Sequence, residues 1–256
     1  VDHVSVGVEP NGSTVSMPMS LSLYGGKVTG QLQVDMSSSK QPNYDANVQI
    51  INLPLSKIMQ QIKTDHLPIK GLFNMNGEFR DSGLMADTLL QGLSGNGHFD
   101  ISQGVLSGID INARINQAKQ QLMGSASNAI LTGTGKTKFS DMAGDFNLQS
   151  YVLQFSNLNL QGNGYTLTGG GQFDMNQNTL NLSLNGQLPE IPESIPVQVS
   201  GPIQNPQMQI DTSILLQQNQ ALQKKQAPPA GMTLEPGIVQ PNNTGTRPVP
   251  VPIPVK

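Results

Sequence analysis

Apolar and polar residues alternate along most of this chain, and the alternation predicts its fold class. The clearest case is Leu180-Asn181-Leu182-Ser183-Leu184-Asn185, where each Leu is followed by a polar residue. Successive side chains of a β-strand point to opposite faces of the sheet, so this segment places its leucines on one face and its polar residues on the other. The pattern predicts a strand with one apolar face and one wet face.

The same two-residue period recurs at short intervals, which predicts many strands joined by tight turns. Apolar residues alternate from Val15 to Leu23 and from Val28 to Met36, on either side of the turn sequence Tyr24-Gly25-Gly26-Lys27. Other stretches with strand character are Val48 to Ile50, Phe73 to Phe79, Phe99 to Ile101, Phe146 to Phe155, Leu158 to Leu160, Tyr165 to Leu167, Phe173 to Met175, Leu180 to Leu184, Val197 to Val199 and Met208 to Ile210. We therefore expect a mainly β protein with a large, curved antiparallel sheet that forms a groove or an open sandwich.

Three segments between these strands show helical spacing of apolar residues instead. They run from Leu55 to Ile62, from Leu89 to Leu93 and from Ile111 to Leu122. Each is predicted to be a short helix that lies across an apolar face of the sheet. A fourth helix is expected over residues 212–226, which end in a basic pair that suits a helix C-terminus.

The last thirty residues, 227–256, contain eight prolines, and they finish in alternating proline and aliphatic residues. Proline lacks a backbone donor and favours extended neighbours, so a disordered, polyproline-like tail is expected here. Such a tail serves as a linker or as a docking peptide for an aromatic groove, and the sequence leaves both readings open.

Charge and cysteine usage narrow the functional classes. The net charge is −3, only 12% of the residues are charged, and there is no cysteine. Because no basic cluster is present to neutralise phosphates, we expect no nucleic-acid partner. The lack of thiols is compatible with export to an oxidising compartment.

Candidate catalytic, cofactor and metal motifs are each explained better by structural roles. Gly133-Thr134-Gly135-Lys136-Thr137 resembles the end of a phosphate loop, but Ile130 stands where that motif requires glycine. His3, His66 and His98 lack metal-ligand spacing, and Asp141 and Asp145 are interpreted as solvated carboxylates flanking a turn. We expect a protein that is not an enzyme and that holds neither a cofactor nor a metal.

The segment from Leu89 to Asp110 contains a glycine-rich strand and ends in Gly104-Val105-Leu106-Ser107-Gly108-Ile109-Asp110, and it resembles a segment of the C-terminal region of the AsmA family. The strands of residues 139–184 and the sequence Pro196-Val197-Gln198-Val199-Ser200-Gly201-Pro202, closed by Pro206 and Asp211, are similar to later parts of that region. The resemblance covers about residues 70–211, and residues 1–69 match only in general style. It departs at Gln149-Ser150, where the family usually has an Asn-Gly turn, so a longer or differently shaped hairpin is expected there.

The resemblance implies a Gram-negative envelope protein related to TamB-like lipid-transport proteins. Residues 1–69 would continue a β-groove from further upstream, and residues 70–211 would form the C-terminal β domain. The implied protein lies in the periplasm, is anchored in the inner membrane by an N-terminal helix that precedes this segment, and supports outer-membrane biogenesis. Its implied partners are phospholipid or another acyl lipid, and envelope assembly proteins that bind the proline-rich tail.

On this interpretation the groove would be lined by apolar residues of two strand regions, namely Leu153, Phe155, Leu158, Leu160, Leu180, Leu182 and Leu184. The helix that carries Ile111, Ile115 and Leu122 would cap the groove end. Phe155 and Leu158 are three residues apart, so a β-bulge is needed to keep both on one face. Periodicity alone favours an ordinary sandwich core over a groove. Two other functions remain open, a periplasmic scaffold that docks envelope machinery and a repetitive adhesin, although the chain has no fixed repeat.

Overall fold

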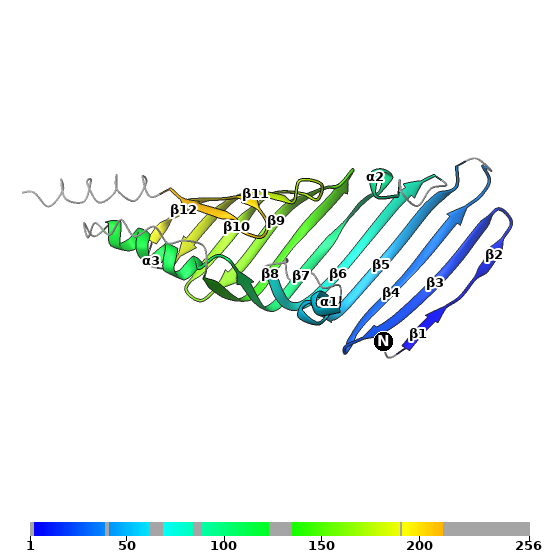
Figure 1. Ribbon diagram of the computed structural model, residues 1–256, viewed down its shortest axis with the longest axis horizontal. Helices are drawn as coiled ribbons and strands as arrows, with labels where there is room; N and C mark the ends of the chain where they lie inside the picture. Colours follow the sequence, from blue (N-terminus) through cyan, green and yellow to red (C-terminus); the bar gives the residue numbers. More distant parts are fainter. Residues whose placement is uncertain are drawn as a thin grey trace, which may run out of the picture.

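Thirteen strands form a single open antiparallel sheet, as the computed structural model shows (Figure 1). The structure describes residues 3–38, 41–61, 69–83, 89–122, 135–189 and 191–211. The strands are β1 (His3–Val6), β2 (Glu9–Asn11), β3 (Thr14–Leu23), β4 (Gly26–Asp35), β5 (Asn43–Pro54), β6 (Ile69–Ser82), β7 (Ser94–Ser107), β8 (Lys136–Gln149), β9 (Val152–Gly162), β10 (Tyr165–Asp174), β11 (Thr179–Leu188), β12 (Ile191–Pro202) and β13 (Gln207–Ile210). The helices are α1 (Leu55–Gln61), α2 (Leu89–Gly92) and α3 (Ile111–Leu122). The prediction of a mainly β fold with a large antiparallel sheet and a few short helices is confirmed.

The strands follow one another across the sheet in chain order. Each of β3 to β12 pairs with the next strand in sequence, β1 pairs with β3, and β2 pairs with β3 to one side of that path. Such a meander needs only short connections, which fits the closely spaced turn signals of the sequence. The predicted boundary between the first two segments falls at residues 69 and 70, at the start of β6. Because β5 pairs with β6, the same sheet continues across this boundary.

Two-residue turns connect several of these strands. At the predicted hairpin, Tyr24 and Gly25 link β3 to β4, both with positive φ (51° and 83°). A turn with two positive φ angles matches the right-handed twist of a strand pair. Ser150 and Tyr151 make the same kind of turn, with φ of 47° and 69°, and Gln149 pairs directly with Val152. The expectation of a longer or differently shaped hairpin at Gln149-Ser150 is therefore wrong, because the strand pair imposes the short turn without an Asn-Gly sequence.

The helices occur where the sequence predicts them but lie at the margins of the sheet. Figure 1 shows α1 and α2 at opposite ends of the strands next to β6, and α3 beside the far end of the sheet. Leu55 of α1 packs against core residues of the sheet, and α2 lies against β6, so for these two helices the placement across an apolar face stays a prediction. The predicted helix at residues 212–226 and the tail at residues 227–256 lie outside the described residues.

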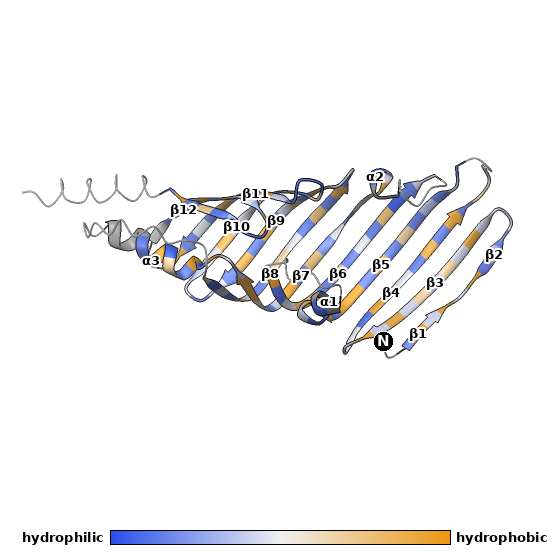
Figure 2. Ribbon diagram, in the orientation of Figure 1, coloured by the Kyte–Doolittle hydropathy of each residue, from blue (hydrophilic) through white to orange (hydrophobic). Residues whose placement is uncertain are grey.

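Hydropathy alternates along the strands, as the bands in Figure 2 show. The buried core residues belong to β7–β13 and to the start of α3, and they include Phe99, Phe146, Leu167 and Val197. Strands β9–β12 are seen close together at one end of the molecule, whereas β1–β8 spread side by side (Figure 1). The sheet therefore hides its apolar residues mainly at the C-terminal end.

Candidate functional site: an apolar sheet face

The apolar residues of neighbouring strands are in register, so they form continuous rows across the sheet. We call one of these rows the middle row. Its members, each paired with the next, are Val6, Met19, Gly30, Val48, Gly77, Gly97, Phe146, Phe155, Gly171, Leu182, Val199 and Met208. The row crosses twelve strands, and every member is apolar or glycine. We call the side of the sheet that carries this row the apolar face.

A second row runs beside the middle row, two residues further along each strand. Its members are Met17, Leu32, Ala46, Phe79, Gly95, Leu148, Leu153, Phe173, Leu180 and Gly201. Each strand from β3 to β12 thus contributes at least two positions to the same apolar surface. The result is a broad apolar band that runs at right angles to the strands.

All seven predicted lining residues lie on this face. Leu153, Phe155, Leu158 and Leu160 come from β9, and Leu180, Leu182 and Leu184 come from β11. Leu160 belongs to the buried core, and the other six are partly buried and pack against it. Between the two strands, β10 contributes Gly169 and Gly171, which pair with Leu184 and Leu182. The structure thus brings the predicted lining residues together, and their lipid contact stays a prediction.

The opposite sides of these strands carry polar groups. The side chain of Gln198 in β12 donates to Asn181 Oδ1 at 2.6 Å and accepts from Ser183 Oγ at 3.0 Å. These exposed side chains satisfy one another across the strand pair, which stabilises the register. The predicted separation of a wet face from an apolar face is found here.

Exposure of the apolar face changes along the sheet. At the N-terminal end Val4 and Val6 are 60% and 61% exposed, and Met19 in the same band is 38% exposed. At the C-terminal end Val197 and Val199 are 5% and 6% exposed. The apolar band is thus open to solvent near β1–β3 and sheltered near β12.

The start of α3 is fixed over the sheltered end. Thr137 of β8 is completely buried, and its Oγ1 accepts a hydrogen bond from the Ile111 amide at 2.9 Å and donates to the Ile109 carbonyl at 2.7 Å. Asp110 caps the helix by accepting from the Ala113 amide at 2.9 Å. Ile111 is only 3% exposed.

The residues of α3 that were predicted to cap the groove end are Ile111, Ile115 and Leu122. Ile111 is part of the core cluster, and Ile115 packs against that cluster. The side chain of Leu122 lies outside the described residues. The helix therefore covers core residues at its N-terminal end, and its capping role stays a prediction.

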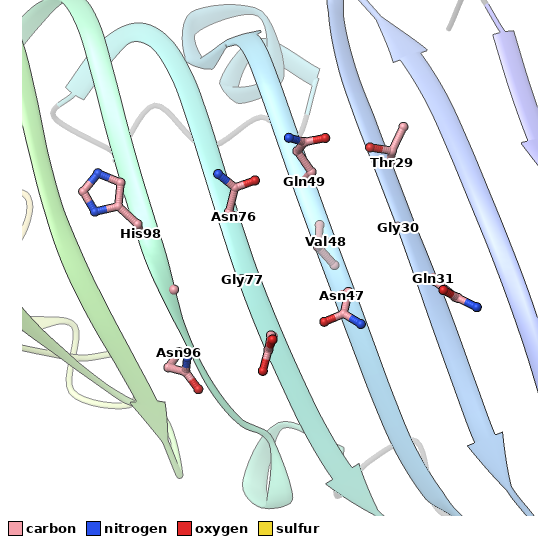
Figure 3. A pocket seen from close by; sticks show the side chains of 12 residues that line it. Thr29, Gly30, Gln31, Asn47, Val48, Gln49, Asn76, Gly77, Asn96 and His98 are labelled. Carbon is pink, nitrogen blue, oxygen red and sulfur yellow. The ribbon is translucent and has the colours of Figure 1, made fainter.

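The polar face carries a wide, shallow trough of about 720 Å³. Figure 3 shows two rows of polar side chains with Gly30 and Gly77 between them. One row has Thr29, Gln49, Asn76 and His98, and the other has Gln31, Asn47, Glu78 and Asn96. Its lining is dominated by neutral amides and contains no Phe, Tyr or Trp side chain.

Four ionisable residues of β7 and β8 lie beside this trough. His98 Nδ1 is 2.7 Å from Asp145 Oδ1, and Asn157 donates to Asp145 Oδ2 at 2.7 Å. These hydrogen bonds lower the pKa of Asp145. Burial, together with a hydrogen bond and charge repulsion from Asp100, raises the pKa of Asp141. Both aspartates lie inside β8, so the prediction that they flank a turn is wrong.

This cluster does not form a metal centre in the described residues. No three His, Asp or Glu side chains of the described ranges come together as a metal site. Lys136 and Thr137, the end of the phosphate-loop resemblance, lie in β8 and not at a helix start.

Sequence reasoning missed the part that glycine plays on the apolar face. The middle row contains Gly30, Gly77, Gly97 and Gly171, which the sequence analysis did not assign to the apolar surface. Their alternation with apolar residues was visible in the sequence. The side chains that cover them became apparent only from the register between strands.

An open antiparallel sheet with an apolar face from edge to edge defines a class of extended β-groove proteins. Consistent with this, the AsmA family model matches residues 11–158. This chain belongs to the AsmA family. No curated protein and no solved structure matches the chain significantly.

The extent of the family match differs from the extent predicted from the sequence. The match includes most of residues 1–69, which showed only a general likeness, and it ends before the segments of residues 162–211 on which the resemblance partly relied. Strands with weak individual motifs thus carry the family signal.

AsmA family proteins are envelope proteins with a role in outer-membrane biogenesis, and they are generally non-catalytic. In the described part of this chain, no helix has the length and hydrophobicity required to cross a membrane.

Proposed function

We propose that the apolar face binds and conducts phospholipid acyl chains between the inner and the outer membrane. The observation that carries this proposal is the middle row, which continues without a charged or polar residue across twelve strands. An ordinary core is confined to the interior of a domain. This surface instead runs from the exposed Val6 to the sheltered Val199.

The dimensions of the row favour a path over a pocket for one molecule. With neighbouring strands about 4.8 Å apart, twelve strands span roughly 50 Å. One leaflet contributes about 15 Å to the hydrocarbon core of a bilayer, so the row is about three acyl chains long. A lipid can therefore advance along the row while its chains remain in apolar surroundings.

The free-energy gain of such a path is large enough to matter. Each methylene exposed to water costs about 0.8 kcal/mol, so a palmitoyl chain in water costs on the order of 12 kcal/mol. A continuous apolar face removes most of this barrier. Because the lipid leaves one apolar phase and enters another, the face supplies little net driving force, and direction must come from other components.

The experiment places charge on the apolar face at Leu182→Asp together with Leu184→Asp. Its matched control, Asn181→Asp together with Ser183→Asp, adds the same charge to the opposite face of β11. Phospholipid that co-purifies is measured by native mass spectrometry, and strand content by circular dichroism. We expect lipid to be lost from the first variant alone, with strand content unchanged in both.

Two outcomes would contradict the proposal. One is unfolding of the first variant, which would indicate a plain structural core at β11. The other is retention of phospholipid by the folded first variant.

The wider proposal is that residues 1–69 and 70–211 are two segments of one groove, and that an N-terminal helix anchors the protein in the inner membrane with the groove in the periplasm.

A further inference from the structure

Two phenylalanine rings from strands that are not neighbours meet on the apolar face. Phe79 belongs to β6 and Phe146 to β8, with β7 between them. The ring centroids are 6.0 Å apart and the ring planes differ by 25°, a stacked arrangement. Strands two places apart are separated by about 9.6 Å, so each ring must lean over β7 to reach the other.

Glycine makes this approach possible. Phe79 pairs with Gly95 and Phe146 pairs with Gly97, so β7 has no side chain beneath either ring. A Cβ atom on Gly95 would lie 2.5 Å from Phe79 Cδ1, and one on Gly97 would lie 2.7 Å from Phe146 Cζ. The rings thus occupy the space that Cβ atoms would fill, and they lie low against the sheet.

Gly77 of β6 also lies next to both phenylalanine rings. A Cβ atom there would lie 3.0 Å from Phe79 Cε2 and 3.1 Å from Phe146 Cζ. Ordinary contacts between carbon atoms are about 3.5–4.0 Å, so both rings would have to move. The three nearest atoms all belong to the two rings, and none belongs to the backbone.

The pair lies where the apolar band passes from its open part to its sheltered part. Phe79 is partly buried, whereas Phe146 is 8% exposed and belongs to the core. An acyl chain that follows the middle row from Met19 toward Leu182 must pass over these rings. The height of the rings above the sheet therefore sets the free depth of the path at this point.

We propose that Gly77, Gly95 and Gly97 are the residues that keep the path open, because they hold the rings of Phe79 and Phe146 flat against the sheet where the path crosses them. This inference rests on the proposed function and assigns the depth of the path to three glycines. A flat aromatic floor admits linear acyl chains, and a methyl group beneath it raises the rings into the path. Gly77 is the informative position, since a Cβ atom on Gly97 would instead lie 2.2 Å from the backbone carbonyl oxygen of Asn76 and disturb the sheet itself.

The experiment uses the absence of cysteine from the chain. Two single-cysteine reporters, Met19→Cys and Leu182→Cys, lie on the middle row on either side of the ring pair and are labelled with bimane. The probe is phosphatidylglycerol with a doxyl nitroxide near the end of one acyl chain, supplied in phosphatidylethanolamine vesicles. Quenching of bimane reports that the acyl chain has reached the labelled position.

In the reporter proteins without further changes we expect quenching at both positions. Adding Gly77→Ala should preserve quenching at Met19→Cys and abolish it at Leu182→Cys. The matched control is Gly186→Ala on the same face, where the nearest atom to a new Cβ lies 3.3 Å away, and it should leave both signals unchanged. Combining Gly77→Ala with Phe79→Leu should restore quenching at Leu182→Cys, because the leaning ring is gone.

The outcomes separate this inference from the proposed function. Without Gly77→Ala, absence of quenching at both positions would contradict lipid conduction as such. Equal quenching at both positions after Gly77→Ala would overturn the role of the glycines and leave lipid conduction standing. Failure of Phe79→Leu to restore the signal would also overturn it, since it would show damage to the sheet and not a raised ring.

Discussion

Phe155 and Leu158 face the same side of the sheet although they are three residues apart in β9. Phe155 pairs with Gly171 and Leu158 pairs with Gly169, so three steps along β9 match two steps along β10. The extra residue lies in this interval, where Asn157 has a positive φ of 51°. This is a β-bulge, and it restores the apolar phase that an odd spacing would otherwise reverse. It confirms the bulge predicted from the sequence.

Deleting Asn157 should therefore destabilise the protein strongly. Without the extra residue, either Leu158 and Leu160 or the residues before them must turn to the polar face. Exposing two leucines costs about 3–6 kcal/mol. Chemical denaturation measures the loss. The control Asn157→Gly keeps the chain length and tolerates positive φ, and it should cost little stability, because the hydrogen bond to Asp145 that it removes is exposed to solvent. A deletion as mild as this control would show that the bulge does not maintain the face.

Replacing Thr137 by valine should loosen the start of α3. Valine has nearly the same shape, but it leaves the Ile111 amide and the Ile109 carbonyl without their buried partner. Each unpaired group costs roughly 1–3 kcal/mol, so we expect a loss of about 2–6 kcal/mol and faster hydrogen exchange at Ile111. Thr137→Ser keeps the hydroxyl group and should retain slow exchange. Slow exchange in the valine variant would mean that packing of Ile111 alone fixes the helix.

The two aspartates of β8 should give opposite pH dependences of stability. The pKa of Asp141 is raised above its ordinary value of 3.8 by burial and by Asp100, with His98 acting against the shift. Its protonated form is favoured by folding, so its contribution is complete below pH 3.8 and is lost as the pH rises through the folded pKa. Asp141→Asn should therefore gain stability relative to the unmodified protein at pH 7 and lose this advantage at pH 3.

Asp145 supplies the control with the opposite sign. Its pKa is lowered by hydrogen bonds from Asn157 and His98, so its contribution is present above pH 3.8 and is lost as the pH falls through the folded pKa. Asp145→Asn should be less stable than the unmodified protein at pH 7, with the difference shrinking toward pH 3. Urea denaturation across this range measures both variants, and the same pH trend in the two would contradict the assigned causes.

Local patterns were sufficient for much of the fold. The strand Thr179–Leu188 and the helix Ile111–Leu122 were predictable because their periods of two and about 3.6 residues are written into consecutive positions. The seven lining residues were predictable for the same reason. The turn at Ser150 was not, because a two-residue turn there is imposed by the pairing of Gln149 with Val152.

The ring pair shows why the rest required the structure. Phe79 and Phe146 are 67 positions apart in the sequence, and each was visible only as an apolar strand residue. Their meeting depends on which strands are neighbours and on the register that places Gly95 and Gly97 beneath them.

The sequence by itself determined that this protein is a sheet with one apolar and one polar face. The side of the sheet on which each side chain lies follows from the alternation of apolar and polar residues within its own strand. Only the tertiary structure decided that these faces join into one row across twelve strands, open at β1 and sheltered at β12. The physical reason is that register and coiling of the sheet are set by contacts between strands, and no single strand carries that information.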